Sequence, residues 1–157
     1  MSGVPPTASA VASKTPPAGL MRHVVNPLVR HVLLRAARRR TGRLVVLEVV
    51  GRRSGRQLRI PVLGHDVDGR MHVFTDAGWA ANFRGGRRCV VVVRGRRRLA
   101  TGEVLPDTEA AAALRQVIAR GDERLLGLRI AADADPTDEE LIGARTAIRI
   151  VLHDDRP

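Results

Sequence analysis

Short apolar runs separated by tight turns constrain the fold of this chain more than any other feature of its sequence. Asp68-Gly69 stands between two such runs, and Asp-Gly is one of the strongest signals for a two-residue β-hairpin turn. A second hairpin is predicted around Arg94-Gly95-Arg96. Because the connections are short and the helices few, the pattern favours a compact antiparallel barrel over parallel βαβ units. Six strands are predicted: Leu44–Val50, Arg59–Val67, Met71–Asp76, Arg88–Val93, Arg97–Leu105 and Thr146–Leu152.

The first forty residues differ in character from the rest. Residues 1–18 are rich in Pro, Ala, Ser and Thr and are predicted to form a flexible tail, whereas residues 19–157 are predicted to form a single domain. Asn26-Pro27 combines a capping residue with a proline at the first helical position, which predicts an amphipathic helix over Pro27–Arg40. Its basic flank has two interpretations. The helix packs on the sheet, or residues 20–40 contact a membrane surface.

Three further segments carry helical signals. A short helix is predicted over Trp79–Arg84 and a longer one over Thr108–Arg120. Thr137 and Glu140 have the spacing of a capping box ahead of another short helix. The segment Glu123–Ala132 fits either a helix or a strand.

The composition limits the kinds of site that the chain can contain. Aromatic residues make up only 2% of the 157 residues, so the core is expected to be aliphatic, and the single tryptophan, Trp79, stands out. Cys89 is the single cysteine, which excludes an internal disulfide and a cysteine metal cluster. The histidines lack zinc-ligand spacing, so no structural metal is predicted. With no long apolar run and no signal-peptide core, the chain is predicted to be cytoplasmic, with peripheral contact to the inner face of the cell membrane as an extension of that prediction.

The charge is strongly basic and unevenly distributed. The formal net charge is +11, and only four acidic residues precede residue 99. Such a chain suits an anionic partner, which is a nucleic acid, a membrane surface or a polyanionic cofactor. Nucleic acid is the weakest of these, because aromatic stacking residues are nearly absent and no nucleic-acid motif is present.

The cationic segment Gly51–Arg56, here called the Gly51–Arg56 turn, carries the clearest chemistry. Its sequence is Gly-Arg-Arg-Ser-Gly-Arg, set between the first two predicted strands. Main-chain N–H groups, a hydroxyl and guanidinium groups can converge there on one small anion. Arg59 and Pro61 follow closely, and Trp79 and Asn82 come after the next hairpin.

In this order, these features resemble the deazaflavin-dependent nitroreductase family, whose members are split β-barrels related to the flavin-binding split barrels. The resemblance covers about Met21–Leu152 and is most specific in Gly51–Pro61 and Trp79–Arg84. It implies a split antiparallel β-barrel that binds coenzyme F-420, a 5-deazaflavin whose tail carries a phosphate and an oligoglutamate. Members pass a hydride from the reduced ring to quinones, nitroaromatics or other electron-poor organic molecules.

The resemblance also implies the residues of the site. The anionic tail would be held by Arg52, Arg53, Ser54, Gly55 and Arg59. The main chain of Thr75, Asp76, Ala77 and Gly78 would border the ring. Trp79 and Asn82, with Pro61 opposite, would shape the ring pocket. The residues themselves leave two simpler alternatives open: Trp79 as a core plug, and Asn82 as a local helix contact.

Two departures from the family narrow the expected function. Asp76-Ala77-Gly78 is shorter than the loop of many relatives, which implies a more open cofactor entrance or a differently placed tail. The nitro-reducing members use tyrosines near the C-terminus, and this chain has no tyrosine. Quinone-like acceptors are therefore preferred to nitroaromatics.

The sequence leaves the proton donor, the ligand and the oligomeric state open. The candidate proton donors to the acceptor are His153, His31 and His23, with solvent as the alternative. A related interpretation keeps the barrel but gives it FMN or a tetrapyrrole as ligand. Another is a non-enzymatic, basic nucleic-acid-binding protein. Either a monomer or a homodimer fits the sequence.

Overall fold

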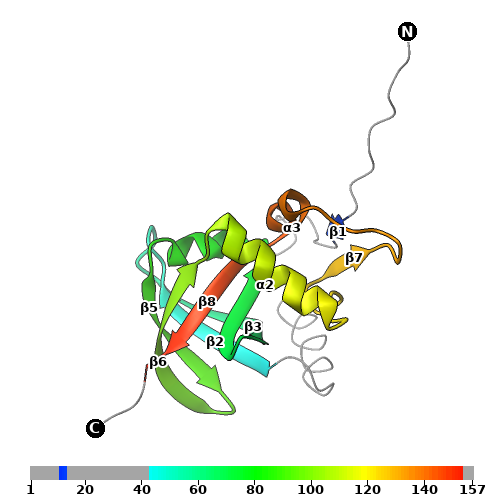
Figure 1. The fold of residues 1–157 in the computed structure, drawn as a ribbon. Helices are drawn as coiled ribbons and strands as arrows, with labels where there is room; N and C mark the ends of the chain where they lie inside the picture. The colour runs from blue at the N-terminus through cyan, green and yellow to red at the C-terminus, as the bar shows by residue number, and fades with distance from the viewer. Residues whose placement is uncertain (1–10, 14–42, 154–157) are drawn as a thin grey trace, which may run out of the picture.

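The chain folds into a closed antiparallel β-barrel (Figure 1). A computed structural model describes residues 11–13 and 43–153. The six barrel strands follow one another in the order β2-β3-β4-β8-β6-β5, and every neighbouring pair is antiparallel. The predicted fold class, an antiparallel split barrel with a few helices, is confirmed. The strands are β2 (Arg43–Val50), β3 (Gln57–Val67), β4 (Arg70–Thr75), β5 (Arg87–Val93), β6 (Arg96–Val104) and β8 (Thr146–Leu152).

Both predicted hairpin turns are confirmed. Asp68 and Gly69 have φ angles of 51° and 73°, and Arg94 and Gly95 have φ angles of 48° and 78°. Positive φ at both central residues defines the type I′ turn, whose twist matches that of the flanking strands. The side chain of Asp66 supports the first turn by accepting a 3.0 Å hydrogen bond from the Gly69 N–H.

The remaining elements lie outside the barrel wall. They are the 3-10 helix η2 (Gly78–Phe83), the helices α2 (Asp107–Ala119) and α3 (Asp138–Ala144), and a two-stranded antiparallel sheet of β1 (Val11–Ser13) and β7 (Leu128–Ile130). The capping box at the start of α3 is confirmed, because Thr137 and Glu140 each bond the other's backbone N–H. No helix among the described residues is long and apolar enough to cross a membrane.

Other sequence predictions concern the segment 123–132 and the N-terminal residues. The segment Glu123–Ala132, which fitted a helix or a strand, contains only the short strand β7 between turns. The predicted helix Pro27–Arg40, and with it residues 20–40, lies outside the described residues. Within the predicted tail 1–18, the structure describes Val11–Ser13, which pairs with β7.

The barrel interior is aliphatic, as the composition predicts. Alternate residues of β2 point inward, so Val45, Leu47 and Val49 are buried. On the outer face of the strand, Val50 is half exposed. Glu48, also on the outer face, is buried instead.

Helix α2 covers part of the outer barrel surface and builds a second core. Figure 1 shows α2 lying across the barrel in front of β8. Leu114 and Val117 on its inner face are fully buried, and Ile118 is partly buried. Leu128 of β7 and Leu141 of α3 complete this cluster. The second core thereby holds α2 and α3 against the barrel.

The end of the barrel next to η2 is closed by a phenylalanine. Phe83 is fully buried, and a Cβ atom at Gly102 would lie 2.5 Å from its ring. Only glycine at position 102 leaves room for this side chain. Trp79 is partly exposed and packs edge-on against Phe83, with ring centroids 6.1 Å apart. Phe83, rather than Trp79, is therefore the core plug.

Candidate functional site

The Gly51–Arg56 turn is a closed loop at one end of the barrel. The Gly51 N–H donates to Arg56 O at 2.8 Å, and the Gly55 N–H donates to Gly51 O at 2.9 Å. Within the described chain, the backbone N–H groups of Arg53 and Ser54 have no hydrogen-bond partner. These two groups, with the exposed arginine side chains of the turn, are the donors that an anion would need.

Both glycines of the turn are required by its geometry. A Cβ atom at Gly51 would lie 2.6 Å from Ser54 Oγ, which is too close for any side chain to fit without movement. Gly55 has a φ of 64°, in the left-handed region that glycine adopts readily. Ser54 Oγ accepts a 3.3 Å hydrogen bond from the Arg56 N–H and so stays inside the turn.

The turn is bonded directly to the helix that carries the tryptophan. The Arg52 N–H donates to Asn82 Oδ1 at 2.8 Å, and Arg52 Nη1 donates to Arg84 O at 3.1 Å. Asn82 Nδ2 in turn donates to Trp79 O at 2.9 Å. The two predicted motifs therefore meet, and Asn82 makes both the local contact that the sequence allowed and a long-range one.

Helix η2 presents three different faces. Residues i and i+3 of a 3-10 helix lie above one another, so Trp79 and Asn82 share a face. Ala80 and Phe83 share a second face, which is buried in the barrel core. The third face, with Ala81, lines a pocket on another side of the helix. The predicted Trp-x-x-Asn motif and this pocket therefore lie on different faces of η2.

The pocket beside η2 has a volume of about 470 Å³, which is within the range of small-molecule sites. Most of its lining residues are small or aliphatic, but polar atoms contribute more of its surface than apolar atoms do. Three of the predicted ring-bordering residues, Asp76, Ala77 and Gly78, form part of its wall. The other lining residues are Ala80, Ala81, Arg84, Val104, Leu105, Asp107, Ala110, Ile142, Arg145, Thr146 and Ala147.

Arg145 is a buried residue of this pocket to which the sequence analysis gave no role. It is 6% exposed, and its Nε donates to Leu126 O at 2.8 Å while Nη2 donates to Gly127 O at 3.2 Å. Its Nη1 lies 3.5 Å from Asp76 Oδ2. Burial lowers the pKa of Arg145, and the Asp76 carboxylate opposes that shift. The ion pair holds Asp76 at the start of the segment that lines the pocket. A single arginine directly before an apolar strand was the only signal in the sequence.

Arg59 and Pro61 lie elsewhere on the barrel surface. Both are exposed on the outer face of β3, where Pro61 stands opposite Val46 of β2. Arg59 Nε lies 3.1 Å from Oε1 of the buried Glu48, and Arg97 Nη2 lies 2.6 Å from its Oε2. That second contact is not a hydrogen bond by its angles, so Oε2 has no hydrogen-bond partner in the described chain. Arg59 is therefore engaged with a carboxylate, unlike Arg53.

Two arginines that the sequence analysis did not include lie beside the turn. The Arg84 carbonyl accepts a hydrogen bond from the Arg52 guanidinium, and Arg84 also lines the pocket. Arg87 Nη2 donates to Val50 O, directly before the turn, at 3.3 Å. The cationic surface at this end of the barrel is therefore larger than the motif alone.

His153, the candidate proton donor that lies within the described residues, is not brought to this end. His153 follows the end of β8 that is far from Thr146, about 23 Å along the strand at the usual rise per residue. Its Nε2 lies 2.9 Å from Thr101 Oγ1. His23 and His31 lie outside the described residues. Thr75, the fourth of the predicted ring-bordering residues, pairs with Thr146 at the pocket end of β8.

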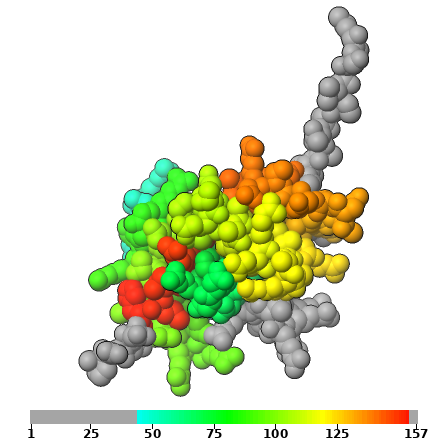
Figure 2. Space-filling view, in the orientation of Figure 1, coloured from blue at the N-terminus to red at the C-terminus, as the bar shows by residue number. Residues whose placement is uncertain are grey.

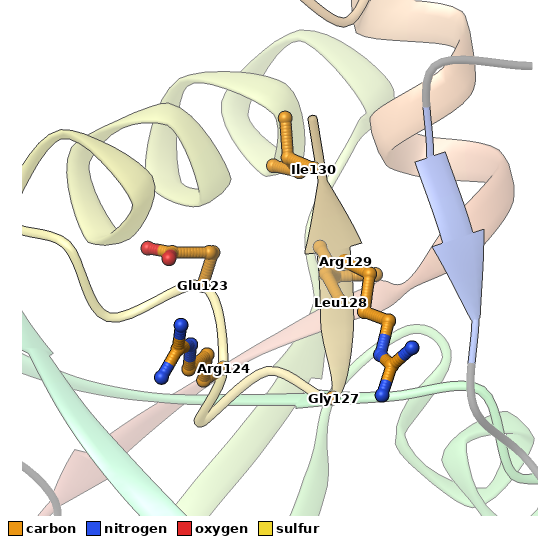
Figure 3. A pocket seen from close by; sticks show the side chains of 6 residues that line it. All are labelled: Glu123, Arg124, Gly127, Leu128, Arg129 and Ile130. Carbon is orange, nitrogen blue, oxygen red and sulfur yellow. The ribbon is translucent and has the colours of Figure 1, made fainter. Parts of the chain in front are cut away.

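A second pocket, larger than the one beside η2, has a different character (Figure 3). Its volume is about 560 Å³, and it is lined only by residues of the segment 123–130 around β7. Glu123 and Arg124 lie on one side of β7 and Arg129 on the other, so the charged groups do not converge. None of the predicted site residues belongs to it. Among the described residues, no group of three or more metal-binding side chains comes together.

Comparisons with known proteins find a similarity to solved structures but no family match. No protein-family model and no curated protein matches the chain. Among solved structures, the chain is similar to the structure of the FAD and heme binding protein from Mycobacterium smegmatis, with 18% identity and a TM-score of 0.47. The similarity covers 74% of this chain and 63% of that protein, so the chain spans less than two thirds of that protein's length. Neither finding assigns the chain to the deazaflavin-dependent family, and that resemblance rests on its motifs.

Proposed function

We propose that this protein is an oxidoreductase that binds coenzyme F-420 and reduces a quinone-like or other electron-poor organic acceptor. The observation that carries the proposal is the hydrogen bond between the Arg52 N–H and Asn82 Oδ1. It joins an anion-binding turn to the helix that holds the single tryptophan. Each motif is weak alone, and their direct contact is what a cofactor with a charged tail and a flat ring would require.

The turn fits an anionic group by its chemistry. Within the described part of the chain, the backbone N–H groups of Arg53 and Ser54 have no hydrogen-bond partner, and they belong to a loop whose glycines the geometry requires. Arg53 is exposed, and no described residue forms an ion pair with it. A charge-assisted hydrogen bond contributes about 1.5–3 kcal/mol, so a phosphate held by two or three such bonds would bind firmly.

The chain's own contribution is binding, orientation and exclusion of water. When bound, a reduced deazaflavin supplies the hydride, and the protein needs no redox group of its own. Asn82 fixes the turn relative to Trp79, and Arg145 fixes Asp76 at the pocket wall. The small side chains around Ala81 leave a pocket with room for an organic ring. Since His153 lies at the other end of β8, we expect the acceptor to take its proton from solvent.

Cofactor titrations would test the proposal directly. Trp79 is the single tryptophan, is partly exposed and lies on η2 next to the pocket-lining Ala80, so its fluorescence reports on binding near this helix. We expect F-420 to quench this fluorescence at low micromolar concentration. Oxidation of the reduced cofactor, followed by its absorbance, should be faster with quinones than with nitroaromatics. The protein without cofactor, and free tryptophan with cofactor, are the matched controls.

Three results would overturn the proposal. Quenching by FMN or FAD, with none by F-420, would replace the deazaflavin by a flavin on the same fold. Quenching by a tetrapyrrole alone would remove the enzyme assignment. A salt-sensitive shift of nucleic acid in gels, with no cofactor bound, would favour the nucleic-acid interpretation.

A further inference from the structure

The β5–β6 hairpin carries a cluster of arginines at the other end of the barrel. Val93, just before its tip, pairs with Val45 near the start of β2, whereas the Gly51–Arg56 turn follows the end of β2. Arg94 and Arg96 at the tip are exposed, and no described residue forms an ion pair with either. Figure 1 shows this hairpin at the lower edge of the molecule, and in Figure 2 green side chains project from that edge.

Exposed apolar side chains lie further along the same hairpin and on the neighbouring strand, with Leu99 three residues from Arg96 on β6 and Val151 on β8. Leu99 is 58% exposed and Val151 is 48% exposed, and they are two of the three large hydrophobic residues described as exposed. Thr101 pairs with Val151 across β6 and β8. Because Leu99 and Thr101 are two residues apart on β6, Leu99 and Val151 lie diagonally on the same outer face.

A cationic tip next to exposed aliphatic side chains is the surface chemistry of proteins that rest on anionic membranes. Arginines near such a surface are attracted by its negative potential, and aliphatic side chains gain from leaving water at the lipid boundary. Single-stranded nucleic acid would instead require aromatic side chains for stacking. The described aromatic residues, Phe74, Trp79 and Phe83, are located elsewhere.

We propose that the tip of the β5–β6 hairpin, with Leu99 and Val151, docks this protein on an anionic lipid surface. The inference is independent of the cofactor proposal. The Gly51–Arg56 turn lies at the opposite end of β2, so docking leaves it open to water-soluble ligands. The contact differs from one through residues 20–40, because it depends on side chains of the barrel itself.

Sedimentation of the full-length protein with lipid vesicles tests this proposal. We expect cosedimentation with vesicles of equal parts phosphatidylcholine and phosphatidylglycerol, and none with phosphatidylcholine alone. The test variant is Arg94→Asn with Arg96→Gln. It creates Asn-Gly at the tip, the preferred sequence for a type I′ turn, so the hairpin should keep its fold. At about fivefold per arginine, binding should fall about 25-fold.

A matched control removes the same charge elsewhere. Arg124 and Arg129 are exposed residues of the 123–130 segment, so Arg124→Gln with Arg129→Gln should lower binding less than threefold, the effect of net charge alone. Leu99→Ser should also weaken vesicle binding without changing the melting temperature, because Leu99 is already exposed.

Three outcomes would overturn the proposal. They are no cosedimentation with anionic vesicles, an equal loss of binding in both double variants, and wild-type binding by the hairpin variant. The last would assign the contact to another region, residues 20–40 included. Binding of single-stranded RNA that the hairpin variant alone loses, with no vesicle binding, would make the surface a nucleic-acid site instead.

Discussion

The backbone N–H of Arg52 lies 2.8 Å from Asn82 Oδ1, and this bond spans 30 residues of sequence. The amide of Asn82 also donates to Trp79 O, so a single side chain ties the cationic turn to the tryptophan. Side chains that bridge two loops in this way fix a geometry that neither loop could hold alone. The consequence is that binding and local order should be lost together when Asn82 is removed.

Replacement of Asn82 by alanine should cost about 1–2 kcal/mol in the free energy of unfolding, because two hydrogen bonds are lost. Cofactor affinity should fall at the same time, since the turn is released from η2. Urea unfolding and Trp79 quenching measure the two effects. Gln57→Ala removes an exposed amide at the start of β3 and serves as the control, with an expected change within about 0.5 kcal/mol. Unchanged affinity in Asn82→Ala would show that the turn holds its shape alone.

Arg53→Ala should weaken cofactor binding about tenfold or more and leave stability unchanged. Its side chain is exposed, and no described residue forms an ion pair with it, so the folded protein loses nothing until an anion arrives. Isothermal titration with F-420 measures the affinity, and thermal unfolding checks the fold. Arg124→Ala, equally exposed on the far segment, is the charge control. Equal affinity in wild type and Arg53→Ala would place the anionic tail somewhere else.

Arg59→Ala should behave differently from Arg53→Ala. Arg59 is 68% exposed, but its Nε lies 3.1 Å from the buried Glu48, so its loss leaves that carboxylate with Arg97 alone. We expect about 1–2 kcal/mol of destabilisation, a value reduced by solvent screening of the exposed guanidinium. Adding Glu48→Gln to Arg59→Ala should restore part of the stability, because no buried charge is then left short of partners. Further destabilisation by the second change would contradict this account of Glu48.

Gly102→Ala should disrupt the packing of η2. Its new methyl group would lie 2.5 Å from the Phe83 ring, and Phe83 is fully buried with no room to move. Overpacking of this kind costs about 1–3 kcal/mol, and Trp79, which packs against Phe83, should show a red-shifted emission. Gly143→Ala is the control, since a Cβ atom there meets nothing within 4 Å and alanine suits helix α3. A wild-type spectrum for Gly102→Ala would mean that Phe83 can reposition.

The barrel could be predicted from the sequence because its signals are local. Asp68-Gly69 and Arg94-Gly95 fix two hairpins through backbone conformations that depend on neighbouring residues only. Strand bounds then follow from apolar runs, and each predicted barrel strand lies within two residues of the observed one. The short connections also favour an antiparallel barrel, which closes between β2 and β5.

The candidate site could be predicted only in part, because its contacts are long-range. The turn and the Trp-x-x-Asn motif were identified, but the bond from Arg52 to Asn82 depends on how the barrel closes. The involvement of Arg59 with Glu48 could not be predicted, since a glutamate in an apolar strand says nothing of its cross-strand partner. Arg145 was missed for the same reason, as two of its acceptor carbonyls, those of Leu126 and Gly127, lie 19 and 18 residues before it in the chain.

Two buried histidines lie opposite each other on the face of the barrel that packs against α2. His65 of β3 and His72 of β4 are direct cross-strand partners, and both rings pack against Phe74. Burial lowers the pKa of both. For His65 the nearby charges are Asp122, which opposes the shift, and Arg120, which adds to it. For His72 the Arg70 carbonyl and Asp68 oppose the shift, and Arg149 and Arg70 add to it.

Stability should therefore decline in mild acid. Because the folded pKa of each histidine lies below the unfolded value of about 6.5, the unfolded chain takes up protons first as the pH falls. The contribution of neutral His65 and His72 is fully present above pH 6.5, is lost as the pH falls from there toward the lowered folded pKa values, and then levels off. Urea unfolding at a series of pH values between about 8 and about 5 measures this slope. The double variant His65→Gln, His72→Gln should be less stable than wild type near pH 8 but should lose less stability on acidification. An equal slope in wild type and variant would assign the acid sensitivity to other groups.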